Sequence, residues 1–475
     1  MSYFYRCTLL VIVFSLASCS KKTFPLLNID GKEYVSVASF GAKGNGKDDD
    51  RPAIQRALDS GKNIYFPNGI YNLKSKTEGV AFLMVKNANY PANILFDDKA
   101  WLKIDKNADA SYFKPSVLCI KGTVQPISNI NITGLKIDGN RLNHTMTNPG
   151  LLLYSDKYLV SDINIINSKM KDMGGGGYHI EADNVYMQDI ETSNCGSHGI
   201  GINAGSYNRT GLVYDIEISN FTSLDDDAYG IDFSGPYDHD KPKETLLSYH
   251  FKGKVKNIKV LNSENGIKTA GNWDLEIDSM VIDGSQHNGF YLSKNAPVKV
   301  INAKNVSISN CKDNGLYLSG ASLFRCENLS VSNATVLMQL DNTDVEITNA
   351  VFDGNYANIA SLRMGNSNVT IDKFVLKNNK ANDEYPIWLQ GKKVVLTNGI
   401  FENLNGISPF IIRNVDEVVL ENIKEERKIG SRIKSFSNGA TIDMKKGKIT
   451  VKNCSFMKDN IRNISNTKVD FKDEK

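Results

Sequence analysis

The sequence predicts an all-β protein that winds into a right-handed parallel β-helix, a solenoid of about 11–13 coils with a short N-terminal capping helix. Three observations predict this fold. Short strands of alternating apolar and polar residues recur along the chain, their spacing is nearly constant, and the segments between them lack helical periodicity.

The recurring strands place apolar residues at every second position. They lie at residues 131–137, 162–165, 184–187, 215–218, 257–260, 274–277, 305–308, 328–331, 344–347, 368–371, 393–396, 417–420 and 448–451. From Ile163 to Ile449, eleven intervals average 26 residues. A fixed period of this size indicates a solenoid, because one repeat cannot bury its apolar face without a neighbouring repeat.

Two other folds share part of this pattern. Leucine-rich repeats have a similar period, but their dense leucine pattern is missing here. A β-sandwich is the second alternative, and the lack of hairpin signals disfavours it. Asn and Gly are frequent at the strand ends, where the tight corners of a solenoid require a left-handed backbone.

Residues 48–58 predict a helix that caps the N-terminal end of the solenoid. We expect one of the aspartates at 48–50 to cap the free amides and Pro52 to occupy the first turn. Ile54, Ala57 and Leu58 would then share an apolar face toward the first coil.

The first residues resemble a bacterial lipoprotein signal peptide. A short segment with one positive charge precedes an apolar run too short to span a bilayer, and residues 16–19 resemble a lipobox. The resemblance implies that Cys19 is lipidated and anchors the mature chain to a membrane. An ordinary cleaved signal with a chance cysteine is the alternative. No Asp stands beside Cys19, so we expect an outer-membrane lipoprotein of a Gram-negative bacterium, facing the periplasm or the cell surface.

The predicted organisation is a signal peptide at residues 1–19, a linker at 20–34, an N-terminal cap with the first coils at 35–110, and the remaining coils at 111–475, the last two forming one domain.

Charge and cysteine content narrow the classes of function. The chain carries 56 Lys and Arg against 53 Asp and Glu, and it has no basic block that could follow a nucleic-acid backbone. We therefore expect no nucleic-acid partner, and the charge is compatible with an acidic polysaccharide as substrate. We also expect the protein to be a monomer. Outside the signal, an odd set of cysteines without CxxC spacing predicts buried thiols; these are Cys119, Cys195, Cys311, Cys326 and Cys454.

A resemblance to a known superfamily supports the fold. Residues 40–50, 53–57 and 64–71 resemble the N-terminal signature of the pectate lyase superfamily. The resemblance implies a right-handed parallel β-helix, but lyases, glycoside hydrolases and phage tailspikes all share it. It also implies that the aspartates at 48–50 are structural caps rather than catalysts.

Six repeats contain a further strand that begins with Gly and alternates apolar and variable residues, starting at residues 177, 199, 230, 266, 289 and 315. In register, their alternate side chains form an outward column of His179, Gly201, Asp232, Lys268, Tyr291 and Tyr317. A second column contains Glu181, Asn203, Ser234, Ala270, Ser293 and Ser319. Adjacent turns of a parallel sheet are ~4.8 Å apart, so we expect Asp232 and Lys268 to be neighbours, with Tyr291 next.

Asp225, Asp226 and Asp227 lie at the corner before the strand that contains Asp232, so four carboxylates fall within eight residues. They would repel one another without a cation between them, and Ca²⁺ prefers such oxygen ligands. We therefore predict a Ca²⁺ site here. A bound cation would also favour the neutral amine of Lys268, which proton abstraction requires.

This constellation resembles the family 9 polysaccharide lyases. Asp226-Asp227 with Gly230-Ile231-Asp232 matches one part of their pattern, and residues 266–271 match the other. The resemblance implies aspartates that hold Ca²⁺ and Lys268 as the base. Two departures weaken the calcium half: Ala228 and Tyr229 are inserted before the glycine, and the strand with Gly201 has no Asp.

The predicted reaction is β-elimination on a uronic-acid polymer such as pectate, alginate, chondroitin or hyaluronan. A cation neutralises the uronate, Lys268 removes the C5 proton, and water or Tyr291 assists the leaving sugar. His179 paired with Tyr291 is an alternative catalytic pair. The alternative for Lys268 and Asp232 is a plain surface ion pair between stacked turns.

Substrate contacts are expected from the residues around these columns, namely His198, Asn203, Tyr229, His287, Lys294 and Tyr317. The longest interval between strands holds an insertion, in which Tyr237 and His239 could stack on sugars. A solvated hinge loop is the alternative for this insertion, and a satisfied polar residue is the alternative for each histidine.

Two rival functions stay open. Asp226-Asp227, His198-Gly199 and residues 265–269 resemble motifs of family 28 glycoside hydrolases, although the order of the motifs differs. A non-catalytic glycan-binding β-helix is the third class.

Overall fold

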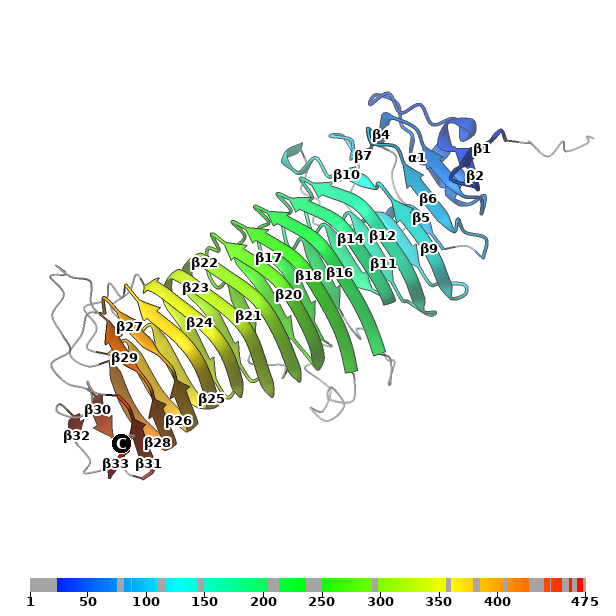
Figure 1. Cartoon of the computed structure of the whole chain (residues 1–475). Coiled ribbons are helices and arrows are strands. Elements are labelled where there is room, and N and C mark those ends of the chain that lie inside the picture. Colours follow the sequence, from blue (N-terminus) through cyan, green and yellow to red (C-terminus); the bar gives the residue numbers. More distant parts are fainter. Residues whose placement is uncertain are drawn as a thin grey trace, which may run out of the picture.

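The computed structural model describes residues 24–74, 81–86, 88–108, 116–143, 149–203, 213–235, 250–292, 298–355, 360–378, 385–404, 409–426, 440–444, 446–454, 461–463 and 468–472. Cys19, Tyr237, His239 and Lys294 lie outside these residues. The described strands wind into one right-handed parallel β-helix, which is the fold class that the sequence predicted (Figure 1). No helix within the described ranges is long and apolar enough to cross a membrane.

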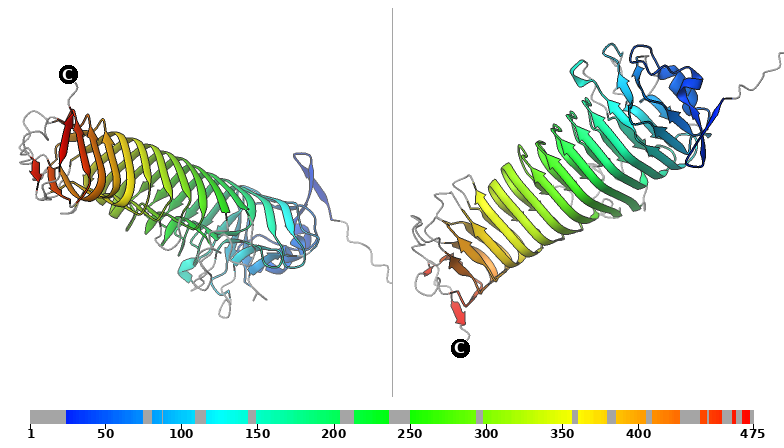
Figure 2. Two further views of the ribbon diagram at one scale, coloured as in Figure 1. Left: turned by 90° about the horizontal axis from the view of Figure 1, so that it is seen from below. Right: turned by 45° about the horizontal axis from the view of Figure 1, so that its top comes forward.

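The N-terminal end departs from the predicted linker. β1 (Leu26–Ile29) and β2 (Lys32–Ser36) form an antiparallel hairpin, although residues 20–34 were expected to be a linker. β2 then pairs in parallel with β3 (Ile64–Phe66), so the hairpin continues into the first coil. The coils stack along one axis from this end to β33 at the other (Figure 2).

The capping helix α1 (Arg51–Leu58) forms as predicted and buries Ala53, Ile54, Ala57 and Leu58. The predicted capping contact is made by Asp49, whose Oδ1 accepts a hydrogen bond from the backbone N–H of Arg51 (3.3 Å), and not by Asp50 directly before the helix. The carboxylate of Asp50 accepts hydrogen bonds from the backbone N–H groups of Lys43 (2.6 Å) and Gly44 (3.1 Å) and none from the helix. Asp50 therefore ties the preceding loop to the helix.

The remaining elements of the first coils are η1 (Val37–Phe40), β4 (Gly69–Leu73), β6 (Asn93–Phe96), β7 (Ala100–Ile104), β9 (Ile127–Thr133), β10 (Lys136–Asp138) and η2 (Arg141–Asn143).

One face of the β-helix is a stack of short strands, and we call this face the site sheet. Its strands are β5 (Ala81–Val85), β8 (Ser116–Lys121), β11 (Leu151–Tyr154), β13 (Tyr178–Glu181), β15 (Ile200–Asn203), β17 (Tyr229–Ser234), β19 (Asn265–Ala270), β21 (Phe290–Leu292), β30 (Ala440–Asp443) and β32 (Ile461–Asn463). Each pairs in parallel with the strand one coil away, so side chains at matching positions form straight columns.

The other faces are built from strands that are 11 or 12 residues long in the middle of the stack, from β12 to β24, and shorter at its C-terminal end. They are β12 (Val160–Lys171), β14 (Asp183–Ser193), β16 (Val213–Leu224), β18 (His250–Leu261), β20 (Trp273–Asp283), β24 (Val345–Asn355), β27 (Ile400–Glu402), β29 (Lys424–Glu426), β31 (Lys448–Lys452) and β33 (Val469–Lys472). Five strands pass through a corner and also contribute to the site sheet: β22 (Val300–Ser319), β23 (Leu323–Asp341), β25 (Leu362–Lys377), β26 (Ile387–Thr397) and β28 (Phe410–Glu421).

The corners use the predicted left-handed asparagines. Asn257, Asn305 and Asn328 have φ of 54°, 53° and 62°. Such residues also bond to each other between coils, since Asn328 Nδ2 donates to Asn305 Oδ1 (2.9 Å) and Asn349 Nδ2 donates to Asn328 Oδ1 (3.0 Å). Asparagine at these positions therefore satisfies both the backbone geometry and the next coil.

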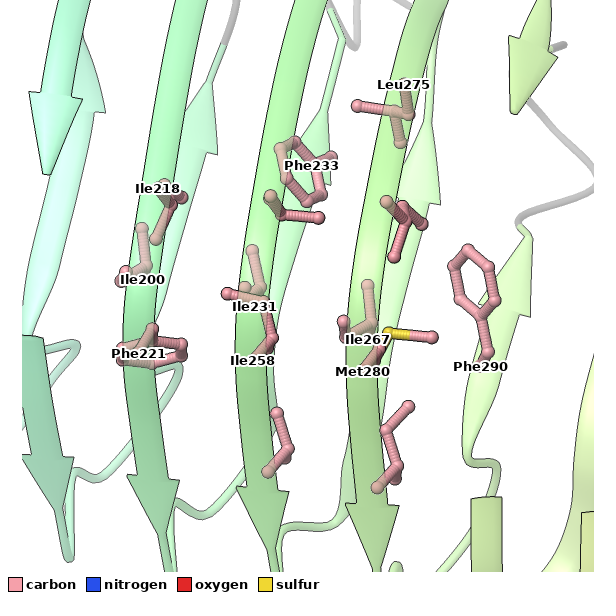
Figure 3. Packing of buried hydrophobic residues seen from close by; sticks show 14 of the residues in the cluster. Ile200, Ile218, Phe221, Ile231, Phe233, Ile258, Ile267, Leu275, Met280 and Phe290 are labelled. Atoms are coloured by element: carbon pink, nitrogen blue, oxygen red, sulfur yellow. The ribbon is translucent and has the colours of Figure 1, made fainter. Parts of the chain in front are cut away.

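The core lies inside the stack and continues from coil to coil. Ile200, Ile231, Ile267 and Phe290 occupy matching positions on β15, β17, β19 and β21, and each is at most 1% exposed (Figure 3). Full burial of such a side chain stabilises the fold by about 1.5–3 kcal/mol. The cysteines at 119, 195, 311, 326 and 454 are free and buried, as predicted.

Candidate functional site

The register of the site sheet confirms the outward column. His179 pairs with Gly201, Gly201 with Asp232, and Asp232 with Lys268. Lys268 then pairs with Tyr291, and Tyr291 with Tyr317. The sheet therefore aligns five polar or aromatic side chains along one line over six coils, with Gly201 as the position that has no side chain.

Lys268 and Asp232 form the centre of this line. Nζ of Lys268 donates to Oδ2 of Asp232 over 3.1 Å, and the two side chains are each 15% exposed. Oγ of Ser234, from the second column, donates to the other oxygen of Asp232 (2.7 Å). Both carboxylate oxygens thus have donors, which fixes the side chain beside Lys268.

Tyr229 forms a wall beside this pair. Its ring lies beneath the ammonium group of Lys268, with 5.0 Å between Nζ and the ring centroid. Burial raises the pKa of Tyr229, while the nearby charge of Lys268 opposes that rise. Tyr229 therefore holds Lys268 in place in addition to its predicted contact with substrate.

His179, the first residue of the outward column, belongs to a second polar group. Oε1 of the buried Glu181 accepts a hydrogen bond from Nε2 of His179 (2.9 Å). Nδ2 of Asn203 lies 3.2 Å from the same nitrogen. The sequence placed Glu181 in the second column without a role, and the structure makes it the residue that orients His179.

His198 fills the gap that Gly201 leaves in the column. A Cβ atom at Gly201 would lie 2.2 Å from Nε2 of His198, so the imidazole occupies the space of the missing side chain. Nδ1 lies 3.2 Å from Oγ of Ser197, and the buried Nε2 has no hydrogen-bond partner among the described residues. The ring centroid is 6.0 Å from that of His179. The line therefore continues without a break from His179 to Lys268.

The electrostatic environment keeps His198 neutral. Burial lowers the pKa of His198 to about 4, and the neighbouring His179 and Lys268 act in the same direction, against the effect of Asp232. At neutral pH this imidazole carries no charge.

The four predicted calcium ligands do not form a shared donor set. Asp226 is 1% exposed, and its oxygens accept hydrogen bonds from Thr192 (2.8 Å), Ser223 (2.7 Å) and the backbone of Cys195 (2.9 Å). Burial raises the pKa of Asp226. The carboxylate thus ties three segments of the corner together from the inside.

The other carboxylates of that set have separate neighbours. Asp227 pairs with Arg141 of η2, Asp232 pairs with Lys268, and Asp225 is an exposed corner residue with φ of 56°. Within the described ranges, no three His, Cys, Asp or Glu side chains are placed to hold a metal ion. These residues do not fit the predicted Ca²⁺ site, because Asp226, Asp227 and Asp232 are engaged by separate partners.

Two of the predicted substrate contacts, Tyr317 and His287, lie in different parts of the structure from each other. Tyr317 stacks on Tyr291, with ring centroids 5.5 Å apart and an angle of 21° between the planes. His287 lies at an exposed corner, where it contacts Asp313 (2.8 Å) and Glu264 (3.5 Å). Tyr317 therefore extends the column, whereas His287 belongs to a group of corner charges.

Sequence reasoning missed residues at both ends of the line. Tyr154 and Lys121 continue the second column beyond Glu181, and Nζ of Lys121 lies 5.1 Å from the centroid of the Tyr154 ring. At the other end the outward column continues with Gln339, Arg363 and Trp388. The strands of Lys121, Gln339, Arg363 and Trp388 do not begin with Gly, so the motif that defined the column did not include them, whereas Gly150 precedes the strand of Tyr154 and could have indicated it.

Comparisons with known proteins support the fold class. The family model described as "Right handed beta helix region" matches residues 246–401. "Mannuronan C5-epimerase AlgE1" of Azotobacter vinelandii is 28% identical over 178 residues, which is 34% of this chain and 12% of the epimerase. "Plasmin and fibronectin-binding protein A" of Streptococcus pneumoniae is 25% identical over 429 residues, which is 78% of this chain and 54% of that protein. The chain thus spans about half or less of these relatives.

Two solved structures are also similar to this chain. The A-module of mannuronan C-5 epimerase AlgE6 of Azotobacter vinelandii has a TM-score of 0.46 and 15% identity, covering 86% of this chain and 97% of the module. The family 28 exopolygalacturonase of Yersinia enterocolitica has a TM-score of 0.40 and 15% identity, covering 87% of this chain and 78% of that one.

Proposed function

We propose that this right-handed parallel β-helix protein is a polysaccharide lyase that cleaves a uronic-acid polymer by β-elimination. The observation that supports this most is the line of side chains on the site sheet, with Lys268 and Asp232 3.1 Å apart at its centre. An extended polymer lying along the site sheet would pass over every residue of this line. Pectate, alginate and glycosaminoglycans such as chondroitin or hyaluronan are the candidate substrates.

The reaction needs a base beside the C5 proton of a uronate. Lys268 and Asp232 share one proton between an amine and a carboxylate. For Lys268 to act as a base, its ammonium group must first give up a proton, and the carboxylate of Asp232, whose Oδ2 lies 3.1 Å from Nζ, is the neighbouring group that accepts it. That amine then removes the C5 proton.

The remaining steps form the double bond and release the leaving sugar. The C5–H pair forms the C4–C5 double bond as the bond between C4 and its glycosidic oxygen breaks. The phenol of Tyr291, on the next coil, donates a proton to the departing oxygen and regains one from water. No step in this scheme uses a metal ion.

Similarity to a mannuronan C5-epimerase favours a second candidate, C5 epimerisation. Both reactions begin by removing the C5 proton next to the carboxylate. An epimerase then returns a proton to the opposite face of C5, whereas a lyase expels the sugar at C4. Because the matched segment is only 12% of that epimerase, we place this activity second.

The contacts in the structure support glycoside hydrolysis less than the sequence motifs did. The family 28 resemblance depended on Asp226 and Asp227, but Asp226 is buried by its three donors and Asp227 pairs with Arg141. Two free carboxylates on opposite sides of the scissile bond are what inverting hydrolysis requires.

One experiment separates these activities. The protein is incubated in D₂O buffer with pectate, alginate, hyaluronan and chondroitin sulfate, and each reaction is followed by ultraviolet absorbance, reducing-end assay and proton NMR. A lyase produces an absorbing unsaturated uronate with new reducing ends. Reducing ends without absorbance indicate a hydrolase, deuterium at C5 of an intact polymer indicates an epimerase, and an unchanged polymer that binds indicates a glycan-binding protein. Any of these last three outcomes contradicts the proposal.

A further inference from the structure

The outward column does not end at the proposed catalytic residues. Tyr317 pairs with Gln339, Gln339 with Arg363, and Arg363 with Trp388 on successive coils. Together with neighbouring side chains, these residues line a hollow of about 430 Å³ on the site sheet. The lining residues with polar or aromatic side chains are Tyr317, Gln339, Asp341, Arg363, Trp388 and Gln390.

Arg363 contributes to this hollow a buried donor without a partner among the described residues. Its Nε is buried and has no hydrogen-bond partner in the part of the chain that the structure describes. Leaving a buried donor unpaired is costly, and a carboxylate is the acceptor that the planar guanidinium group matches best. The side chain is therefore suited to bind an anion that enters the hollow.

An aromatic residue lies on each side of Arg363 along the outward column. Trp388 lies on the next coil, where the guanidinium group of Arg413 stacks on its ring at 5.1 Å from the centroid. Tyr317 lies two coils before Arg363 and is stacked on Tyr291. Flat rings of this kind present an apolar face to a sugar, while Gln339 and Gln390 can bond to its hydroxyl groups.

We infer that this hollow is a distal subsite for a uronate of the same polymer. Arg363 binds the carboxylate, and Trp388 and Tyr317 contact the faces of the sugar rings. Asp341, whose Oδ1 accepts from Nδ2 of Asn342 (3.0 Å), then accepts bonds from sugar hydroxyls. The acidic substrate in this inference rests on the proposed function, but the subsite is defined by different residues.

The spacing of the coils sets the position of the subsite. Arg363 lies four coils from Lys268, which corresponds to ~19 Å along the site sheet. One coil advances the sheet by roughly the length of one sugar in a 1,4-linked polymer, so several sugars separate the subsite from the base. A polymer held at both places is cleaved internally, and short substrates lose the contribution of the subsite.

The test measures binding in the full chain with Lys268→Ala, so that substrate is not consumed. Calorimetry compares Lys268→Ala with the double variant Lys268→Ala/Arg363→Gln. The probes are oligoalginate and oligogalacturonate of about eight sugars, long enough to span the ~24 Å from Lys268 to Trp388, the corresponding disaccharides, and a neutral cello-oligosaccharide. Arg325→Gln in the same background is the matched control, because Arg325 is exposed and pairs with Glu346 on another face.

We expect Arg363→Gln to weaken binding of at least one long acidic probe by roughly ten- to a hundred-fold, as expected for loss of a charge-assisted bond. Binding of disaccharides should not change, and Arg325→Gln should bind as the parent does. A further variant, Trp388→Ala, should weaken binding of the same long probe.

Equal affinity of the parent and the Arg363→Gln variant for both long acidic probes would overturn the subsite. An equal loss for the neutral probe would overturn the role of Arg363 in binding a carboxylate. Thermal denaturation of each variant identifies a folding defect, in which case Arg363→Lys replaces Arg363→Gln. If the unmodified protein forms no unsaturated product but Arg363→Gln still weakens binding, the lyase proposal fails and the subsite stands.

Discussion

Nζ of Lys268 lies 3.1 Å from Oδ2 of Asp232, although 36 residues separate the two in the chain. The β-helix produces this contact through register alone, because one coil returns the backbone to the neighbouring position of the site sheet. Asp232 is fixed by Ser234 and Lys268 lies over the ring of Tyr229, so the pair is held from two sides. A pre-positioned amine and carboxylate of this kind suit proton transfer.

Replacement of Lys268 by Ala should abolish most of the elimination activity. Loss of a general base typically costs about 10²–10⁴-fold in rate, and we expect kcat to fall within this range. Steady-state ultraviolet assays measure the effect. Lys259→Ala is the matched control, since Lys259 is an exposed lysine on β18. Wild-type kcat in Lys268→Ala would remove Lys268 from the role of base.

Replacement of Tyr291 by Phe should separate chemistry from binding. The ring and its stacking on Tyr317 remain, but the proton for the leaving sugar is lost. We expect kcat to fall by about 10²-fold while KM changes little. Tyr186→Phe, on another face of the helix, should have no effect on kcat. An increase in KM with unchanged kcat would instead assign Tyr291 to substrate binding alone.

The fold could be predicted from the sequence because each coil repeats the same requirement. Apolar residues such as Ile231 and Ile267 must face inward at every turn, and the corners need asparagine in the left-handed region. The period and the alternation therefore appear directly in the sequence. The β-hairpin at the N-terminus was missed because it lies outside the repeat.

The site could be predicted only where register decides it. The Asp232–Lys268 contact follows from counting coils, but the position of His198 over Gly201 depends on how a corner side chain folds back. The inward orientation of the Asp226 carboxylate likewise depends on the hydroxyl groups of Thr192 and Ser223, and no spacing in the sequence reveals these contacts. Arg363 was missed because its strand lacks the glycine that marked the other strands.

Chelation should leave the activity intact. The predicted calcium ligands Asp226, Asp227 and Asp232 are engaged by hydroxyl groups, Arg141 and Lys268, respectively. We therefore expect equal rates with and without EDTA, measured on the best substrate of the initial screen. A loss of activity that CaCl₂ restores would instead return Ca²⁺ to the mechanism.

Replacement of Asp226 by Asn should reduce stability rather than catalysis. An amide cannot accept from Thr192, Ser223 and the backbone of Cys195 as the carboxylate does. Urea denaturation should show a loss of about 1–3 kcal/mol in the free energy of unfolding. The adjacent exposed residue gives the control, because Asp225→Asn should change stability by no more than about 0.5 kcal/mol. Wild-type stability with lost activity would indicate that Asp226 acts on the substrate.

His198 should make the stability of the folded protein depend on pH in a defined window. Its pKa is about 4 in the folded protein, below the value of ~6.5 expected for an unfolded chain. The unfolded chain therefore binds the proton more readily, so this contribution is complete above about pH 6.5 and is lost as the pH falls toward 4. The change amounts to at most about 3 kcal/mol.

Denaturation of the wild-type protein and of His198→Gln at several pH values tests this expectation. The variant lacks the titrating ring, so its stability should fall less than that of the wild type between pH 6.5 and about 4. Ser197→Ala is the control, because it removes the contact to Nδ1 while the imidazole stays over Gly201. Parallel pH profiles for wild type and His198→Gln would mean that the imidazole gains a proton in the folded protein as easily as in the unfolded chain.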